Sequence, residues 1–108
     1  AAAFLFSNNH NNNLGFICHC RREYTKAIRY YRTALRLNPN KAEAYNNLGA
    51  AYEDIKNYQK ARENYRKALR LDPGHSRART NLLELEITQV KKSKRKKMLG
   101  NPNSCIVF

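Results

Sequence analysis

The sequence lacks any long apolar run, because no stretch of eighteen or more apolar residues occurs among its 108 residues. It therefore contains no segment that is predicted to cross a membrane as a helix. The apolar opening, residues 1–6, is too short for the hydrophobic region of a signal peptide and has no basic residue before it. It also has no initiator methionine, so we expect that the chain begins inside a longer one or carries additional residues.

Acceptor sites for N-glycosylation are absent as well, and the three cysteines are an odd number. Both features favour a reducing compartment over secretion, so a cytoplasmic location is expected. Acidic residues are scarce: 8 stand against 21 basic ones, which gives a formal net charge of +13 and a pI near 10.1. This excess of positive charge indicates an acidic partner, either an acidic peptide, an anionic membrane surface or nucleic acid.

The residue patterns of an enzyme are missing too. We find no paired carboxylates, no glycine-rich phosphate loop and no nucleophile with a matching base. We therefore expect a protein that has no catalytic residues and needs no cofactor.

What the sequence does contain is an internal repeat with a period of 34 residues. The matched pairs are Leu14 and Leu48, Gly15 and Gly49, Tyr24 and Tyr58, Ala27 and Ala61, Tyr31 and Tyr65, and Ala34 and Ala68. The run 35–39 recurs in the same way as 69–73, each time ending in proline. A fixed period of this length is typical of stacked helical hairpins, because one hairpin cannot bury its apolar face alone.

The second repeat, residues 42–75, resembles the tetratricopeptide repeat (TPR) family. The residues that carry the resemblance are Tyr45, Leu48, Gly49, Tyr52, Ala61, Tyr65, Ala68 and Pro73. The resemblance implies an all-α fold, a right-handed stack of antiparallel helical hairpins that forms a TPR solenoid. In such a stack the alanines and glycines let helices approach closely and the tyrosines fill the space beside them, so these residues are assigned to the core.

The repeat boundaries divide the chain into five parts. They are an irregular segment at 1–7, repeat one at 8–41, repeat two at 42–75, a capping helix with a basic end at 76–98, and a tail at 99–108. Helices are predicted at 9–21, 24–37, 42–55, 58–71 and 76–98. Ser76 is expected to cap the last helix, whose outer face reads as polar.

The first repeat departs from the family pattern at two positions. Asn11 stands where a large aromatic residue is expected, so the first helix is predicted to fray at its start, and Cys18 replaces the residue that corresponds to Tyr52. The run Cys18–Cys20 has a histidine at its centre, but residues two apart on a helix point about 200° apart and cannot share a metal ion. No second cysteine pair exists, so no metal site is predicted and Cys18 is assigned to the core.

The resemblance also places a binding groove on the concave side of the stack, where first helices lie. Asn13, Asn47 and Asn81 share one register there (13 + 34 = 47, 47 + 34 = 81). They are similar to the asparagine ladder of some family members, in which side-chain amides hold the backbone of an extended peptide. The alternative is that asparagine merely tolerates an exposed helical position. The full set of predicted groove residues is Asn12, Asn13, Phe16, Asn46, Asn47, Ala50, Glu53, Arg77 and Asn81.

Other family members grip a C-terminal carboxylate with five set residues. Asn47 and Arg77 match that set, whereas Asn12, Phe16 and Asn81 replace the expected lysine, asparagine and basic residue. The resemblance therefore favours a peptide or partner helix as the ligand over a chaperone tail.

The C-terminal residues carry a separate signal. The chain ends in Cys105-Ile106-Val107-Phe108, the form of a prenylation box that favours geranylgeranylation of Cys105. Six basic residues precede it, namely Lys91, Lys92, Lys94, Arg95, Lys96 and Lys97. A basic run and one lipid together form a two-part anchor, so attachment to the cytoplasmic face of a membrane is predicted. The alternative is that the cysteine lies there by chance or that the terminus is artificial.

The sequence also allows three further hypotheses about function and organisation. The basic run also has the composition of a nuclear localisation or nucleic-acid signal, but no base-reading motif accompanies it, which makes nucleic acid the weaker hypothesis. The two repeats could be a piece of a longer TPR array with an incomplete groove. Exposed helix faces at the end of such a piece would also favour self-association.

Overall fold

The computed structural model describes the backbone of residues 8–100 and the side chains of residues 8–94. The helices are α1 (Asn8–Cys20), α2 (Tyr24–Leu37), α3 (Ala42–Asp54), α4 (Tyr58–Leu71) and α5 (Ser76–Gly100), and the described residues contain no strand. The predicted all-α architecture is confirmed, with every helix end within two residues of its expected position. Residues 1–7, predicted to be irregular, and residues 101–108 of the predicted tail lie outside the described residues. Residues 99 and 100, which were assigned to the tail, are the last two residues of α5 instead.

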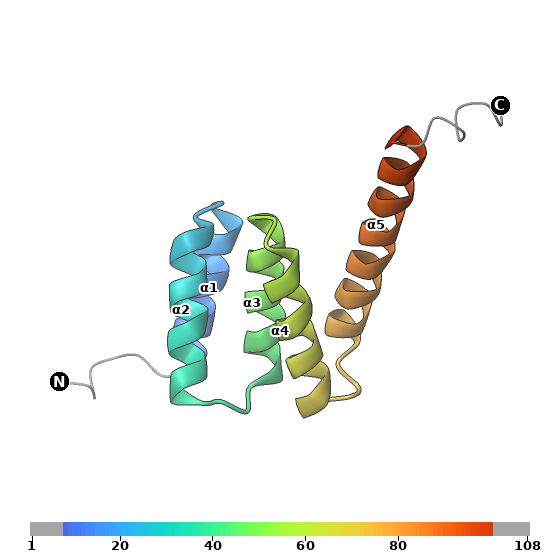
Figure 1. Cartoon of the computed structure of the whole chain (residues 1–108). Coiled ribbons are helices and arrows are strands. Elements are labelled where there is room, and N and C mark those ends of the chain that lie inside the picture. Colours follow the sequence, from blue (N-terminus) through green and yellow to red (C-terminus); the bar gives the residue numbers. More distant parts are fainter. Residues whose placement is uncertain (1–7, 101–108) are drawn as a thin grey trace.

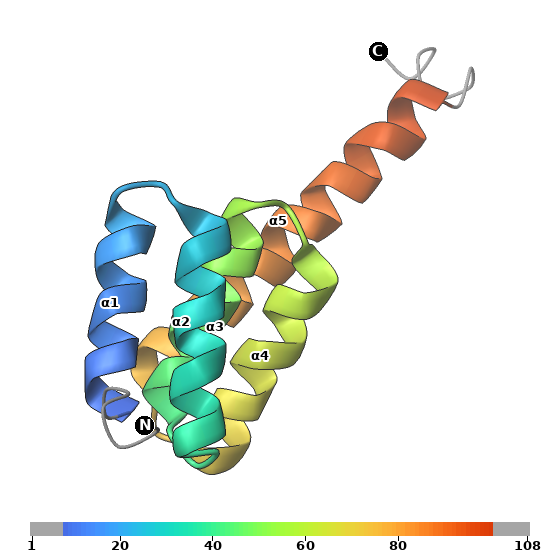
Figure 2. The same cartoon turned by 90° about the vertical axis from the view of Figure 1, so that its left-hand side faces the viewer.

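The helices form two layers (Figures 1 and 2). Helices α1, α3 and α5 make one layer, and α2 and α4 make the other, so that α1 pairs with α2 and α3 pairs with α4 as antiparallel hairpins. Helix α3 also packs on α2 and on α1, which joins the two hairpins, and α5 packs on α4 and α3. The C-terminal part of α5 extends past the end of α4, away from the hairpins.

The core consists of the residues that repeat every 34 positions. Ala27, Ala61 and Tyr31 are completely buried, and Tyr65 is 1 % exposed. A Cβ atom added to Gly15 would lie 2.6 Å from the Tyr31 ring, and one added to Gly49 would lie 2.8 Å from the Tyr65 ring. Since real Cβ atoms do not approach so closely, the tyrosine ring of each hairpin requires the glycine opposite it.

The first helix is regular from Asn8 onward. The side chain of Asn8 donates to the main-chain oxygen of Ala34 at 2.7 Å, and Asn11 is buried at 5 % exposure. This helix therefore begins one residue earlier than predicted. Its expected fraying stays a prediction.

The ends of α1 and α3 share one turn. Arg22 and Lys56, which are 34 residues apart, have positive φ values of 64° and 65°. After each of them the chain folds back: the N–H of Glu23 donates to Cys18, and that of Asn57 donates to Tyr52. These are the long-range bonds of a Schellman turn, which ends one helix and directs the next one back along it.

Candidate peptide-binding face

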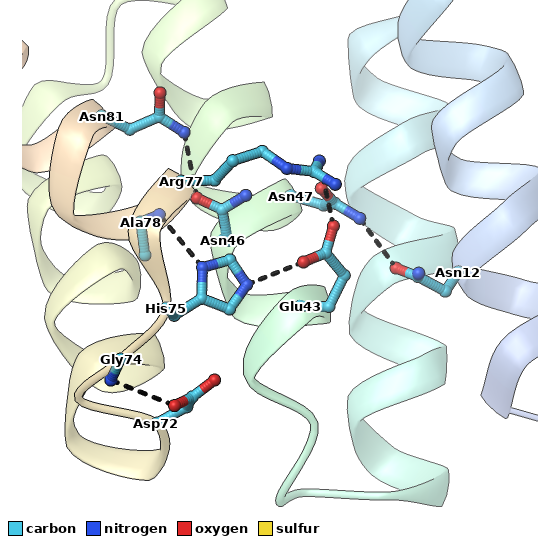
Figure 3. Close-up of polar contacts among 10 residues, drawn as sticks. All are labelled: Asn12, Glu43, Asn46, Asn47, Asp72, Gly74, His75, Arg77, Ala78 and Asn81. Atoms are coloured by element: carbon cyan, nitrogen blue, oxygen red, sulfur yellow. Dashed lines mark hydrogen bonds and ion pairs between the residues drawn. The ribbon is translucent and has the colours of Figure 1, made fainter.

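Two asparagine pairs join the helices of the α1–α3–α5 layer (Figure 3). The Nδ2 of Asn47 donates to the Oδ1 of Asn12 at 3.1 Å, and the Nδ2 of Asn81 donates to the Oδ1 of Asn46 at 3.0 Å. The second pair is the first one shifted by 34 residues. The amides therefore connect consecutive repeats and give the first helices a fixed spacing. We call the surface of this layer around Asn13, Asn47 and Asn81 the asparagine face.

The pairing changes the role of one predicted groove residue. Asn46 is only 2 % exposed, so it is buried between α3 and α5 and does not line a ligand surface as predicted. Asn47 is 8 % exposed and Asn81 is half-buried. Each uses one amide N–H in its pair, and a side-chain amide has a second N–H and a carbonyl oxygen besides.

The remaining predicted residues differ in exposure. Asn13 and Phe16 of α1 are exposed, Phe16 by 54 %, whereas Asn12, Ala50 and Glu53 are half-buried. Glu53 accepts the hydroxyl hydrogen of Tyr65 at 2.8 Å, so it also supports the core. Hydrogen bonds join Asn12 to Asn47 and Asn46 to Asn81. The nine predicted residues therefore do not form one hydrogen-bonded network.

A second cluster holds the start of α5 and was missed in the sequence. The Nε2 of His75 lies 2.7 Å from a carboxylate oxygen of Glu43 on α3, and Arg77 pairs with the other oxygen at 3.2 Å. The Nδ1 of His75 accepts the N–H of Ala78 at 3.1 Å. Since Nδ1 accepts, Nε2 carries the proton and donates to Glu43. Figure 3 shows this chain of contacts from α3 to α5.

His75 therefore caps α5, and the prediction of Ser76 as the cap was wrong. Ser76 is the first helical residue instead. The sequence held a weak sign of this contact, because His75 and Glu43 occupy the repeat positions of Lys41 and Asn9. Lys41 donates to the side chain of Asn9 at 2.9 Å, so the same two positions are joined in both repeats.

The outer side of α5 is less polar than expected. Leu83, Ile87 and Val90 are exposed by 58, 45 and 52 %. Their spacing of four and three residues places them on one side of the helix. The capping role of α5 stays a prediction, because this side offers an apolar surface where a polar one was expected.

The basic run begins on α5. Lys91 and Lys94 are exposed, whereas the Nζ of Lys92 lies 3.4 Å from the hydroxyl of Tyr58 on α4. The side chains of Arg95, Lys96 and Lys97 and the whole of Cys105 lie outside the described residues. None of the described helices is long and apolar enough to cross a membrane.

The Cys18–Cys20 run makes contacts of other kinds. Cys18 is half-buried against the core, and Cys20 is exposed. His19 lies 2.5 Å from a carboxylate oxygen of Asp54. Within the described part of the chain no three side chains of histidine, cysteine, aspartate or glutamate are grouped as metal ligands would be.

The comparison with protein families agrees with this architecture. The model of the tetratricopeptide repeat matches residues 6–74, which is more than half of the chain. The chain belongs to the TPR family. TPR domains are in general non-catalytic modules for protein–protein interaction. The fold and the repeat pattern of this chain are those of a TPR domain.

Two solved TPR structures are similar to it. The Sgt2 TPR domain from Aspergillus fumigatus is 28 % identical with a TM-score of 0.74, and the match covers 78 % of this TPR chain and 56 % of that one. This chain thus spans little more than half of the Sgt2 domain. The second TPR of Spaghetti (RPAP3), bound to the HSP90 peptide SRMEEVD, is 21 % identical with a TM-score of 0.75 and 84 % coverage of both chains. No curated protein sequence matches.

Proposed function

We propose that this TPR module binds an extended peptide segment or a partner helix on its asparagine face. The observation that carries the proposal is the pair of inter-repeat amide bonds, Asn12 with Asn47 and Asn46 with Asn81. They fix the orientation of the amides of Asn47 and Asn81 before any ligand arrives, and a preorganised polar group loses little entropy on binding. A peptide unit offers one N–H and one C=O, which the remaining N–H and oxygen of an amide can match.

The surroundings of the amides fit an uncharged backbone better than a charged terminus. Arg77 is already paired with Glu43, and only two of the five residues of the carboxylate-gripping set are present. The RPAP3 domain that is similar in fold binds an HSP90 peptide, but at 21 % identity that likeness concerns the fold alone. We therefore propose recognition of a peptide backbone, with exposed Phe16 as an apolar contact beside it.

The test compares two substitutions that break the same hydrogen bond. Asn81→Ala and Asn46→Ala both remove the hydrogen bond between these two side chains, but of the two residues only Asn81 is accessible to a ligand. Partners recovered with the protein from cell extract, identified by mass spectrometry, should be lost with Asn47→Ala and Asn81→Ala. Recovery with Asn46→Ala should only be reduced, because this variant removes the residue that orients Asn81 but no amide that contacts the ligand. Equal recovery with all three variants would remove the asparagine face as the binding site.

We also propose that the basic run and Cys105 tether the module to a membrane surface. Support comes from Lys91 and Lys94, which are both exposed on α5. Each basic side chain near an anionic leaflet contributes roughly 1 kcal/mol, and one lipid chain alone binds only marginally. The two signals should therefore act together.

Intact-mass measurement of the protein isolated from its own cells tests this anchor. A C-terminal peptide that ends at Cys105 with an added isoprenoid supports it. A native C-terminal peptide that still carries Val107 and Phe108 without lipid would end the proposal.

A further inference from the structure

A groove lies on the side of the molecule away from the asparagine face. It runs between α2 and α4, and residues of α3 form its floor. Figures 1 and 2 show α2 and α4 side by side in one layer with α3 behind them. We call this hollow the α2–α4 groove. It is formed by the second helix of each hairpin, so it is independent of the surface in the proposed function above.

The walls of the α2–α4 groove are strongly basic. Arg32 and Arg36 come from α2, Lys60 and Lys67 come from α4, and Glu63 is the one acidic residue among the lining side chains. A second hollow on α2 shares Arg32 and Arg36 and adds Arg29. None of these five basic side chains pairs with an acidic residue of the described part, whereas Arg62 and Arg66 of the same α4 helix both pair with Glu86. The groove thus holds positive charge that the described part of the chain does not neutralise.

Two of the cations are held against the floor. The Nζ of Lys60 lies 5.3 Å from the centre of the Tyr52 ring, and the Nζ of Lys67 lies 5.7 Å from that of Tyr45. These cation–π contacts fix the positions of the ammonium groups. Each lysine also occupies one face of its ring, and a nucleotide base needs a free ring face to stack on. A smaller apolar side chain, by contrast, can contact the part of the Tyr45 ring that stays exposed. The arrangement therefore favours an acidic peptide over single-stranded nucleic acid.

The length of the basic row fits a short peptide. Helices α2 and α4 run parallel, and Lys60 and Lys67 of α4 occupy the repeat positions of residues 26 and 33 of α2. Together with Arg32 and Arg36, the four cations therefore extend along the groove over a length that corresponds to residues 26–36 of α2. At 1.5 Å per residue this is about 15 Å, which an extended chain spans with roughly five residues. Between the cations Leu35 and Tyr45 remain partly exposed and can contact an apolar side chain.

We propose that the α2–α4 groove binds a short extended segment of a partner protein that is rich in aspartate and glutamate and contains an apolar residue. The four groove cations attract the carboxylates, and Leu35 and Tyr45 contact the apolar side chain. The module would then have two binding sites for protein segments, one on each layer, with different chemistry.

The probe is a fluorescein-labelled peptide of alternating glutamate and leucine, and its glutamine and leucine counterpart is the control peptide. Fluorescence anisotropy at about 0.15 M salt gives the affinity, where attraction between distant charges is screened. We expect Arg36→Gln combined with Lys67→Gln to weaken binding of the acidic peptide by about tenfold or more. Glu63→Gln should strengthen it severalfold, because it removes the one acidic side chain of the groove.

The matched control removes two charges elsewhere. Arg70 occupies the repeat position of Arg36, and Lys91 is exposed on α5, so Arg70→Gln with Lys91→Gln changes the net charge equally without touching the groove. Equal weakening by both double variants would reduce the binding to unspecific attraction and overturn the proposal. An unlabelled thymidine oligonucleotide that displaces the peptide and loses affinity only in the groove variant would reassign the groove to nucleic acid. Asn47→Ala should leave the affinity of the acidic peptide unchanged, which separates this site from the asparagine face.

Discussion

At the scale of single residues, the two core tyrosines occupy one register but differ in their hydrogen bonds. The hydroxyl of Tyr65 donates to Glu53, whereas that of Tyr31 is buried without a partner among the described residues. The cause is the residue that precedes each tyrosine by twelve positions. It is Glu53 in repeat two, but in repeat one it is His19, which contacts Asp54.

This difference predicts opposite effects for the same substitution. Tyr31→Phe removes a buried hydroxyl that has no partner, so the free energy of unfolding should stay unchanged or rise by up to about 1 kcal/mol. Tyr65→Phe removes a made hydrogen bond and should lower it by about 0.5–1.5 kcal/mol. Urea unfolding of both variants measures the difference. A loss of equal size in both would show that the Tyr31 hydroxyl does have a partner.

The glycine opposite Tyr65 allows a second prediction. Gly49→Ala places a Cβ 2.8 Å from the tyrosine ring and should lower the stability by about 1–3 kcal/mol, because the ring cannot move within a close-packed core. Gly74→Ala is the control, since its added Cβ would meet only Asp72 at an ordinary 3.5 Å. Its effect should be close to zero in the same denaturation experiment. A Gly49→Ala variant as stable as the parent would show that the two hairpin helices can separate without cost.

At the scale of helices, α5 depends on a side chain that lies just before it. His75 accepts the N–H of Ala78 and donates to Glu43, so it both caps α5 and joins it to α3. His75→Ala should lower the stability by roughly 1–2 kcal/mol, of which about half is the lost cap. His75→Ser keeps an oxygen that can cap the helix and should recover that half.

Hydrogen exchange locates the effect. In His75→Ala the amides of the first turns of α5 should exchange faster. Those of α2 should be unaffected, since α5 packs on α4 and α3 and not on α2. Uniformly faster exchange throughout the molecule would mean that α5 does not open separately from the repeats.

The positions of the helices could be predicted from the sequence, whereas the contacts between repeats could not. The 34-residue period located all five helices, the buried tyrosines and the glycines opposite them, because equivalent residues occupy equivalent places. The contacts between repeats join residues that are not equivalent. Asn12 pairs with Asn47 and His19 with Asp54, both 35 apart, and Glu43 pairs with His75, 32 apart.

Such offsets depend on the angle and rotation of neighbouring helices, which the period does not specify. This is why the burial of Asn46 and the role of His75 were not found in the sequence, and the ligand role of Asn13, Asn47 and Asn81 stays a prediction. The α2–α4 groove was missed for a related reason. Its cations come from different positions of the two repeats, so they form a pattern only once the helices lie side by side.

At the scale of the whole molecule, the exposed side of α5 and the net charge of +13 have opposite effects on self-association. Leu83, Ile87 and Val90 favour contact between copies, and the positive charge opposes it. Added salt screens the charge but not the apolar contact, so association should increase with salt. Sedimentation velocity should show this increase for the parent and for Thr88→Gln, and a much smaller one for Ile87→Gln. Association that decreases with salt would exclude the α5 surface as its cause.

The stability of the whole fold should also depend on pH in the alkaline range. Burial raises the pKa of Tyr31 above its ordinary value of about 10, and burial together with the hydrogen bond to Glu53 raises the pKa of Tyr65. Above pH 10 both tyrosines ionise in the unfolded chain but stay protonated in the folded one, so the unfolded state binds fewer protons. The free energy of unfolding then falls as the pH rises, by up to about 1.4 kcal/mol per pH unit for each tyrosine, and this contribution is complete below pH 10.

Urea unfolding between pH 9 and pH 11 measures that slope, and the phenylalanine variants assign it. Tyr31→Phe should remove about half of the tyrosine contribution, and the double variant with Tyr65→Phe should remove all of it. The parent and the variants differ only at these tyrosines, so the comparison between them isolates the two hydroxyls. A slope that is identical in the parent and in the double variant would mean that these two buried hydroxyls do not govern the alkaline stability of the repeat.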